Sequence, residues 1–378
     1  MSKKVVFIGP AHPYRGGIAA FNENLAITFQ NNGWTCKIFT FMQQYPNILF
    51  PGKDQFVHGE RKPDLRIKRA IYSTNPLNWL KISKQITKEN PDIVITQYWM
   101  PFMAPAFGTI LRGIKKALPA TKCITVVHNF KPHESRIGDI QLNKFIANRT
   151  DLMVSLSPSV TRDISTSLPD KAILSLFHPI YDHYGTSISS SEARKKLQLE
   201  ENCFYLLFFG LIRSYKGLED LIQALSLVKS KRKFKLLIAG EFYENENKYL
   251  KQIEKLGLQE KIIIRNEYIP NEEVPDYFCA CDLVVLPYKT ATQSGVVPIA
   301  IHFEKQIIVT KVGSLTELIR EYQIGWTCES DPKDLAEKID LVLESGLNKH
   351  ADFGSIRKEL SWQSFFNKFI EELNLHEP

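Results

Sequence analysis

Residues 205–217 have the sequence Tyr205-Leu206-Leu207-Phe208-Phe209-Gly210-Leu211-Ile212-Arg213-Ser214-Tyr215-Lys216-Gly217. The first five residues are an apolar run typical of a buried strand, and after Gly217 apolar residues at 218, 221, 222 and 225 have the spacing of one helix face. A strand, a loop that contains glycine and a helix in this order indicate a parallel α/β sheet. This stretch therefore predicts an α/β fold.

The first half of the chain opens in the same way. The run Val5-Val6-Phe7-Ile8 precedes Gly16-Gly17, and apolar residues at 18, 21, 25 and 29 then recur at helical spacing before Asn32-Gly33. We predict further strands at 36–41, 93–97 and 123–127, and in the second half at 235–239, 261–265, 283–286 and 306–310. The predicted fold is α/β, with two doubly wound, Rossmann-like domains.

The length of 378 residues also fits two domains, since single domains usually have about 100 to 200 residues. Residues 178–184 and the serines between 187 and 191 have the composition of a linker. We therefore predict a first domain at 1–183 and a second at 184–360. An apolar helical stripe begins after Ser361, a good N-cap, and predicts a terminal helix at 361–378.

The composition excludes several classes of protein. No apolar run approaches the roughly 20 residues that cross a bilayer, and the chain does not begin like a signal peptide, so we expect a cytoplasmic protein. The net charge is +7, but aromatic residues are not interleaved with the cations, so we expect no nucleic acid partner. Residues 61–88, from Arg61 to Lys88, carry eight Lys and Arg against one acid, Asp64. With Trp79 this segment could hold the protein peripherally on the inner face of the cell membrane; a solvated helix face is the alternative.

Three loops could carry chemistry. Arg213 and Lys216 precede Gly217 and a helix, so two cations and a helix N-terminus could converge on a diphosphate; a merely solvated loop is the alternative. Small residues also open a probable helix at Thr292-Gln293-Ser294-Gly295-Val296-Val297, where backbone N–H groups could face a ligand. Gly16 and Gly17 could allow a close approach after the first strand. An ordinary helix start and a tight turn are the alternatives for these two loops.

Several stretches, in the right order along nearly the whole chain, together resemble the retaining nucleotide-sugar glycosyltransferases of family four, which have the GT-B fold of two Rossmann-like domains facing a central cleft. The matching stretches are Gly16-Gly17-Ile18-Ala19, Val126-Val127-His128-Asn129, residues 209–217, Ala280-Cys281-Asp282-Leu283 leading to Pro287, and Val312-Gly313-Ser314-Leu315-Thr316-Glu317. The resemblance implies that the terminal helix crosses back to the first domain.

The resemblance also implies residue roles. Arg213 and Lys216 would bind the two phosphates of the donor and stabilise the charge that develops as the sugar leaves, and His128 would point at the donor sugar. The other donor-binding positions would be Gly16, Gly17, Glu241, Tyr268, Ile269, Thr292, Gln293, Ser294, Gly295, Val296 and Val297. His133 and Glu134 would serve the acceptor. For His128 the alternative is a structural role. For His133 and Glu134 the alternative is that they are merely charged residues of a loop.

The chain departs from the family pattern at one motif. Two glutamates usually stand eight positions apart around the Gly295 loop, and here Thr292 and Ala300 occupy those positions. Neither residue can replace a carboxylate, so recognition of the sugar and ribose hydroxyls must differ. The chain also lacks an Asp-x-Asp motif, and we expect neither a metal nor another cofactor.

We therefore expect a retaining enzyme that moves a hexose or N-acetylhexosamine from a nucleoside diphosphate sugar to an acceptor hydroxyl. A lipid-linked glycan in surface polysaccharide synthesis is the expected acceptor class. A 2-epimerase of the same architecture and a catalytically inactive, transferase-like partner are the two alternatives.

Overall fold

The fold is taken from a computed structural model that describes residues 2–45, 56, 64–131, 137–180, 184–291, 294–313 and 315–375. Two compact units divide the chain, namely Met1–His178 with Trp362–Pro378, and Pro179–Ser361. The first unit thus ends at His178 rather than at 183, and the second ends at Ser361 rather than at 360. The amide of Ile180 already donates to the carbonyl of Leu360 at 2.9 Å, which ties the start of the linker to the second unit.

Among the described residues, the first unit forms a seven-stranded sheet in which all neighbouring strands are parallel. The spatial order of its strands is β3 (Ile67–Tyr72), β2 (Thr35–Gln43), β1 (Lys4–Ile8), β4 (Ile93–Tyr98), β5 (Lys122–Val127), β6 (Leu152–Ser155) and β7 (Ile173–Ser175).

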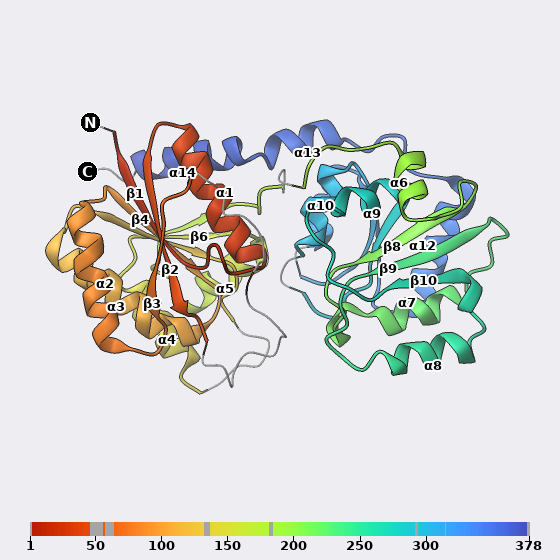
Figure 1. The fold of residues 1–378 in the computed structure, drawn as a ribbon, viewed down its shortest axis with the longest axis horizontal. Coiled ribbons are helices and arrows are strands. Elements are labelled where there is room, and N and C mark those ends of the chain that lie inside the picture. Colours follow the sequence, from red (N-terminus) through yellow and green to blue (C-terminus); the bar gives the residue numbers. More distant parts are fainter. Residues whose placement is uncertain are drawn as a thin grey trace. The chain divides into compact units, whose positions relative to one another are not determined.

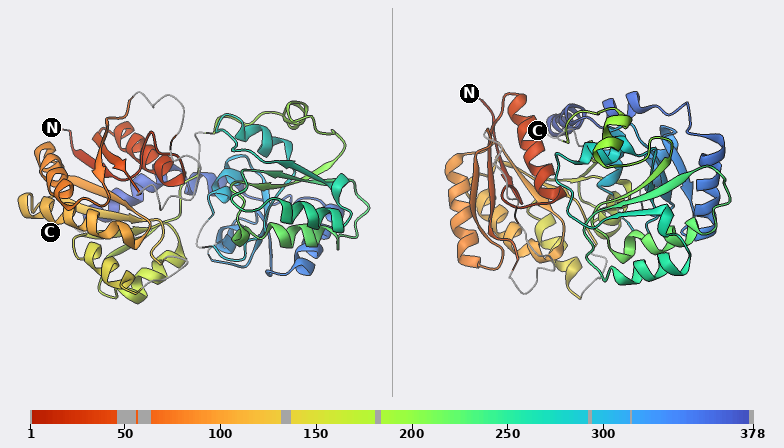
Figure 2. Two further views of the ribbon diagram at one scale, coloured as in Figure 1. Left: turned by 60° about the horizontal axis from the view of Figure 1, so that its bottom comes forward. Right: turned by 45° about the vertical axis from the view of Figure 1, so that its right-hand side comes forward.

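Helices cover both faces of this sheet (Figures 1 and 2). Successive side chains of a strand point to opposite faces, so Val6 and Ile8 join one apolar cluster and Val5 and Phe7 join the other. The first face is covered by α2 (Pro76–Glu89), α3 (Ala104–Ala117), α4 (Asp139–Ala147) and α5 (Pro158–Ser167), with the short 3₁₀ helix η2 (Pro101–Met103) before α3. The second face is covered by α1 (Gly17–Asn31) and α14 (Trp362–Leu375), which contact each other.

In the described part of the second unit, six parallel strands form the sheet. Their spatial order is β10 (Ile262–Arg265), β9 (Phe234–Ala239), β8 (Phe204–Phe209), β11 (Leu283–Leu286), β12 (Gln306–Thr310) and β13 (Gly325–Cys328). Helices α7 (Leu218–Leu225), α8 (Asn247–Lys255) and α12 (Pro332–Ser345) pack in one apolar cluster with alternate residues of β8 and β9. The remaining helices are α6 (Ser190–Lys196), α9 (Val274–Ala280), α10 (Val296–His302), α11 (Leu315–Glu321) and α13 (Phe353–Glu359), with η3 (Ser214–Lys216) and η4 (Gln259–Lys261) as 3₁₀ turns.

The strand order places a topological switch point in each unit. In the first unit it lies between β1 and β4, and in the second between β8 and β11, where the chain order reverses direction across the sheet. Open α/β sheets bind ligands outside the carboxyl ends of their strands at such points. The predicted fold class, two Rossmann-like α/β domains, is confirmed, and each unit offers one edge for a site.

The basic segment contains one corrected prediction. Trp79 on α2 is only 9% exposed and its Nε1 donates to the carbonyl of Tyr72 at 2.7 Å, so it packs inward and does not face a membrane. The apolar side chains that α2 does expose are Leu77 and Leu80, at 79% and 51%. Arg61 and Lys62 lie outside the described residues. No helix in the part of the chain that the structure describes is long and apolar enough to cross a membrane.

Candidate active site

Two glycines bring the loops of the second unit together at its switch point. Gly217 has a left-handed φ of 72°, and a Cβ on it would lie 1.8 Å from the carbonyl oxygen of Pro287, which follows β11. A Cβ on Gly240, after β9, would lie 2.2 Å from the carbonyl oxygen of Gly210, which follows β8. Only residues without a side chain allow these approaches. The loops after β8, β9 and β11 therefore pack directly against one another.

Lys216 is buried where these loops meet. It is 8% exposed, and its ammonium nitrogen lies 5.8 Å from the centroid of the Tyr288 ring. Burial, together with the nearby charge of Arg213, lowers the pKa of Lys216 to about 8. Within the described residues no carboxylate pairs with this ammonium. A buried cation without a counter-ion is costly, and it indicates a site built to receive an anion.

Arg213 is the second cation of the loop. Its guanidinium carbon lies 5.0 Å from the centroid of the Tyr243 ring, and the described part of the chain places no carboxylate in an ion pair with it. The acids nearby serve other partners. Glu244 accepts from the amide of Ser214 and pairs with Lys248 at 2.7 Å, while Asp220 pairs with Lys289 at 3.3 Å. These two carboxylates are therefore engaged by lysines other than Lys216.

The Gly295 loop approaches the same place. The hydroxyls of Ser294 and Tyr288 are 3.2 Å apart, and a Cβ on Gly210 would lie 3.9 Å from Cγ2 of Val296. Ser294 Oγ also accepts from the amide of Val296 at 3.2 Å, so this N–H, predicted to face a ligand, is already engaged in the chain as described. Val297 follows it as the second residue of α10. Thr292 and Gln293 lie outside the described residues.

The remaining donor-side candidates of the second unit lie in the loops after β9 and β10. Glu241 comes after β9, and its carbonyl accepts from the amide of Ile212 at 2.9 Å. Tyr268 and Ile269 come after β10, where Tyr268 is exposed and Ile269 is buried. Because the Ile269 side chain is buried, only its backbone is suited to contact a base. All these candidates thus follow the carboxyl ends of adjacent parallel strands.

Three residues of and after α10 have structural roles. Ala300 is fully buried in the helix, and His302 donates from Nε2 to the carbonyl of Gly185 at 2.8 Å. Glu304 pairs with Arg357 at 2.7 Å. These contacts engage the side chains of His302 and Glu304 within the second unit.

In the first unit, Gly16 and His128 follow strands on either side of β4. Gly16 has a φ of 114° and is exposed at the start of α1, where a Cβ would meet no atom within 4 Å. Gly17 is the first residue of that helix. His128 follows β5, and its Nε2 lies 2.8 Å from Gln97 Oε1. Burial, and to a smaller extent the charge of His178, lowers the pKa of His128 to about 3, so the imidazole is neutral at physiological pH. The acceptor candidates His133 and Glu134 lie outside the described residues.

Two polar residues behind His128 were not predicted. Asn22 lies on the buried side of α1 and Gln97 at the end of β4, and both are fully buried. Each of them is a polar residue at a position that the apolar pattern predicts to be buried, and this is the sequence signal that could have identified it. Gln97 continues the apolar run of a predicted strand, and Asn22 stands four residues after Ile18 on the apolar helix face.

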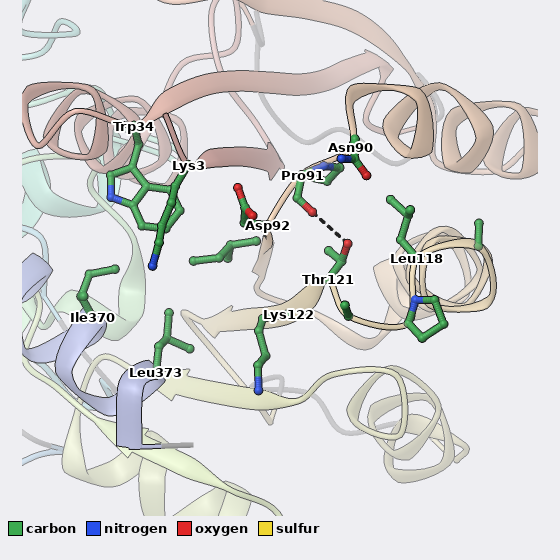
Figure 3. Close-up of a pocket in the computed structure, with 14 residues that line it drawn as sticks. Lys3, Trp34, Asn90, Pro91, Asp92, Leu118, Thr121, Lys122, Ile370 and Leu373 are labelled. Atoms are coloured by element: carbon green, nitrogen blue, oxygen red, sulfur yellow. Dashed lines mark hydrogen bonds between the residues drawn. The ribbon is translucent and has the colours of Figure 1, made fainter. Parts of the chain in front are cut away.

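A cavity of about 450 Å³ lies at the opposite edge of the first sheet (Figure 3). The residues at or before the amino ends of β1, β4 and β5 line it, together with Trp34 and residues of α14. Its central carboxylate, Asp92, already accepts from the amide of Lys4 at 2.6 Å. Because the candidate residues of this unit lie at the carboxyl ends of the strands, the cavity is separate from the site.

Comparison with known proteins agrees with this arrangement. The family model for Glycosyl transferases group 1 matches residues 189–359, and that for Glycosyltransferase Family 4 matches residues 15–174, so together they cover most of the chain. The chain belongs to the family-four glycosyltransferases. The predicted family and enzyme class are thus confirmed.

Three similar proteins illustrate the breadth of this family. An uncharacterized glycosyltransferase of Methanocaldococcus jannaschii is 24% identical over 98% of this chain and 99% of its own. A GDP-mannose:glycolipid 4-beta-D-mannosyltransferase of Xanthomonas campestris is 26% identical over 56% of this chain and 57% of its own. The crystal structure of Anabaena HepE in complex with UDP and glucose has a TM-score of 0.71 at 16% identity, covering 98% of this chain and 99% of that one. The last likeness shows the fold.

Proposed function

We propose that this glycosyltransferase moves a hexose or N-acetylhexosamine from a nucleoside diphosphate sugar to an acceptor hydroxyl, with retention at the anomeric carbon. The observation that carries the proposal is the burial of Lys216 beside Arg213 at the switch point of the second unit, with no carboxylate partner among the described residues. Two fixed cations match the charge of a diphosphate. Binding of UDP by a protein of the same fold supports this choice of ligand.

In the proposed reaction, Arg213 and Lys216 hold the diphosphate and stabilise the negative charge that grows on it as the bond to the sugar breaks. The departing phosphate oxygen takes the proton of the acceptor hydroxyl on the same face, and the acceptor oxygen forms the new bond to the anomeric carbon. The two cations balance the charge without a metal in this scheme. The proposal assigns the neutral imidazole of His128, in the first unit, to a hydroxyl of the sugar.

A binding experiment tests the proposed site. Titration of nucleoside diphosphates and their sugars into the wild type should identify one base, and Arg213→Ala should weaken its binding by roughly tenfold or more, since one charge-assisted contact is lost. Arg232→Ala is a matched control, because Arg232 lies over the Phe204 ring at the amino end of β8. Equal binding by the wild type and Arg213→Ala would refute the site. NMR of the product would show the anomeric configuration.

We further propose a lipid-linked acceptor held at an anionic membrane. Helix α2 exposes Lys81, Lys84 and Lys88 together with Leu77 and Leu80, and the neighbouring β3 adds the exposed Lys68 and Arg69. Cations attract anionic headgroups, and exposed leucines add apolar contact. The similar mannosyltransferase of Xanthomonas campestris is named for a glycolipid acceptor, which agrees with this choice.

Vesicle sedimentation tests the membrane proposal. The wild type should bind vesicles with anionic lipid and not neutral ones, and replacing both Leu77 and Leu80 by Ser should weaken that binding. Leu341→Ser, at an exposed leucine of α12 in the second unit, is the control. Equal partitioning with and without anionic lipid contradicts the proposal.

A further inference from the structure

A series of buried amides leads from the loop after β1 to His128. Asn22 Nδ2 donates to the carbonyl of Pro10 at 2.9 Å, and Gln97 Nε2 donates to Asn22 Oδ1 at 3.2 Å. Gln97 Oε1 in turn lies 2.8 Å from His128 Nε2. Gly9 makes room for this series, since a Cβ on it would lie 2.8 Å from two carbon atoms of the Gln97 side chain. The elements β1, α1 and β4 therefore all contribute to the surroundings of one imidazole.

The carbonyl of Pro10 fixes the direction of every hydrogen bond in the series. A carbonyl oxygen only accepts, so Asn22 must turn its nitrogen toward Pro10 and its oxygen toward Gln97. Gln97 must then use its nitrogen toward Asn22, which leaves its oxygen for His128. Because that oxygen also only accepts, the proton of the imidazole must be on Nε2.

We infer that Asn22 and Gln97 are positioning residues that hold His128 as the neutral tautomer with its proton on Nε2, so that Nδ1 offers a lone pair to a hydroxyl of the donor sugar. The assignment of that hydroxyl to the sugar rests on the proposed function, whereas the tautomer rests on the hydrogen bonds alone. His128 then accepts a hydrogen bond through Nδ1 and delivers no proton there. Its role is to orient the sugar.

The surroundings of the ring support this assignment. Phe21 meets the imidazole edge to face, with centroids 4.9 Å apart and an interplanar angle of 88°, so the orientation of the ring is fixed as well as its tautomer. His178 lies on the same Phe21 ring and is the titratable group that acts on His128. Nδ1 has no hydrogen-bond partner within the residues that the structure describes.

Nitrogen-15 NMR of histidine-labelled, unliganded protein tests the tautomer at pH 7. The His128 signals are identified by their loss in His128→Asn, and they should show a protonated Nε2 and an unprotonated Nδ1. Gln97→Met keeps the side-chain volume but removes the acceptor, so the Nδ1-protonated tautomer should become populated. Thr125→Val on β5 removes a buried hydroxyl that lies 2.8 Å from the Thr150 hydroxyl, and it should leave the His128 signals unchanged.

Kinetics with the donor found in the binding experiment adds a second readout. Gln97→Met should lower kcat/KM by roughly tenfold while binding of the nucleoside diphosphate alone stays unchanged, since the diphosphate is assigned to Arg213 and Lys216. A proton on Nδ1 in the wild type, or an unchanged tautomer in Gln97→Met, overturns the inference. Because the tautomer is measured without ligand, a wild type that binds no nucleotide would refute the proposed function and leave the NMR result to decide the roles of Asn22 and Gln97.

Discussion

The ammonium of Lys216 lies 5.8 Å from the ring centroid of Tyr288, and this contact joins the loop after β8 to the loop after β11. Burial raises the pKa of Tyr288, so the phenol stays neutral and offers the cation only its ring face and its dipole. Tyr288 is held in turn by Ser294, whose hydroxyl lies 3.2 Å from its own. The protein thus holds a cation in place without neutralising it.

Nucleotide-sugar binding should depend on pH through Lys216. The free protein holds this lysine at a pKa of about 8, and a bound diphosphate favours the ammonium form, so binding above pH 8 must take up a proton. Affinity should therefore be nearly constant below about pH 7 and fall by about tenfold per pH unit once the pH exceeds the pKa. Calorimetry in buffers of different ionisation enthalpy would measure both the affinity and the proton uptake. A flat profile up to pH 9 contradicts the assignment, and Lys216→Met should give that flat profile at lower affinity.

Replacing Lys216 should stabilise the second unit. Its pKa falls from 10.5 to about 8 on burial, which corresponds to a cost on the order of 3 kcal/mol for the charged form. Lys216→Met removes this cost and keeps the volume, so we expect a gain of about 1 to 3 kcal/mol together with weaker diphosphate binding. The wild type should become more stable as the pH rises from 8 to 10.5, because the unfolded chain binds the extra proton in that window.

Hydrogen exchange of second-unit amides would measure this gain. Lys289→Met is the matched control, since Lys289 is 40% exposed and pairs with Asp220 at 3.3 Å on the surface. Its free energy of unfolding should change by less than about 1 kcal/mol. A loss of stability in Lys216→Met would mean that the ammonium is satisfied in the free protein.

Gly217→Ala should separate backbone strain from loop packing. At a φ of 72° any alanine costs about 1 kcal/mol, and here its Cβ would also lie 1.8 Å from the Pro287 carbonyl, so the two loops must move apart. Gly257→Ala has a similar φ of 65° but meets no atom within 4 Å. Thermal unfolding should show a modest loss in Gly257→Ala and a larger loss in Gly217→Ala, and calorimetry should show weakened diphosphate binding in Gly217→Ala alone. Equal binding by the two variants would place the diphosphate elsewhere.

All interior strands except β6 were predicted from sequence, whereas β10 was the one edge strand predicted among those that the structure describes. The cores of β1 and β8 are continuous apolar runs because both faces of each strand are covered by helices. β3 is an edge strand whose Lys68 and Arg69 are exposed, so its composition indicated only a basic segment. β13 begins with Gly325, where a Cβ would lie 1.9 Å from the carbonyl of Ile307. A residue that usually indicates a loop is required here by strand packing.

The site residues, too, were predictable only where the signal lies in the local sequence. The strand–loop–helix order placed Arg213 and Lys216 at a carboxyl edge, because that consequence follows from local sequence. The burial of Lys216 depends on Tyr288, which is distant in sequence, and no local pattern predicts the contact. Trp79 was misplaced for a related reason, since an aromatic residue in a basic helix can lie on either face until the packing partner, here the Tyr72 carbonyl, is known.

His128 should make the first unit sensitive to acid. Its pKa is lowered from 6.5 to about 3 in the folded chain, so between these values the unfolded chain binds a proton that the folded chain does not. The stability that depends on neutral His128 is complete above pH 6.5 and is lost as the pH falls toward 3, by about 1.4 kcal/mol per pH unit.

Urea unfolding followed by tryptophan fluorescence would measure this loss of stability, because Trp34, Trp79, Trp99 and Trp362 all lie in the first unit. The slope of unfolding free energy against pH should decrease in His128→Gln and stay unchanged in His350→Gln, an exposed histidine of the second unit. An unchanged slope in His128→Gln would show that the imidazole is protonated in the folded protein, and the hydrogen bond from Nε2 to Gln97 would then not define a neutral tautomer.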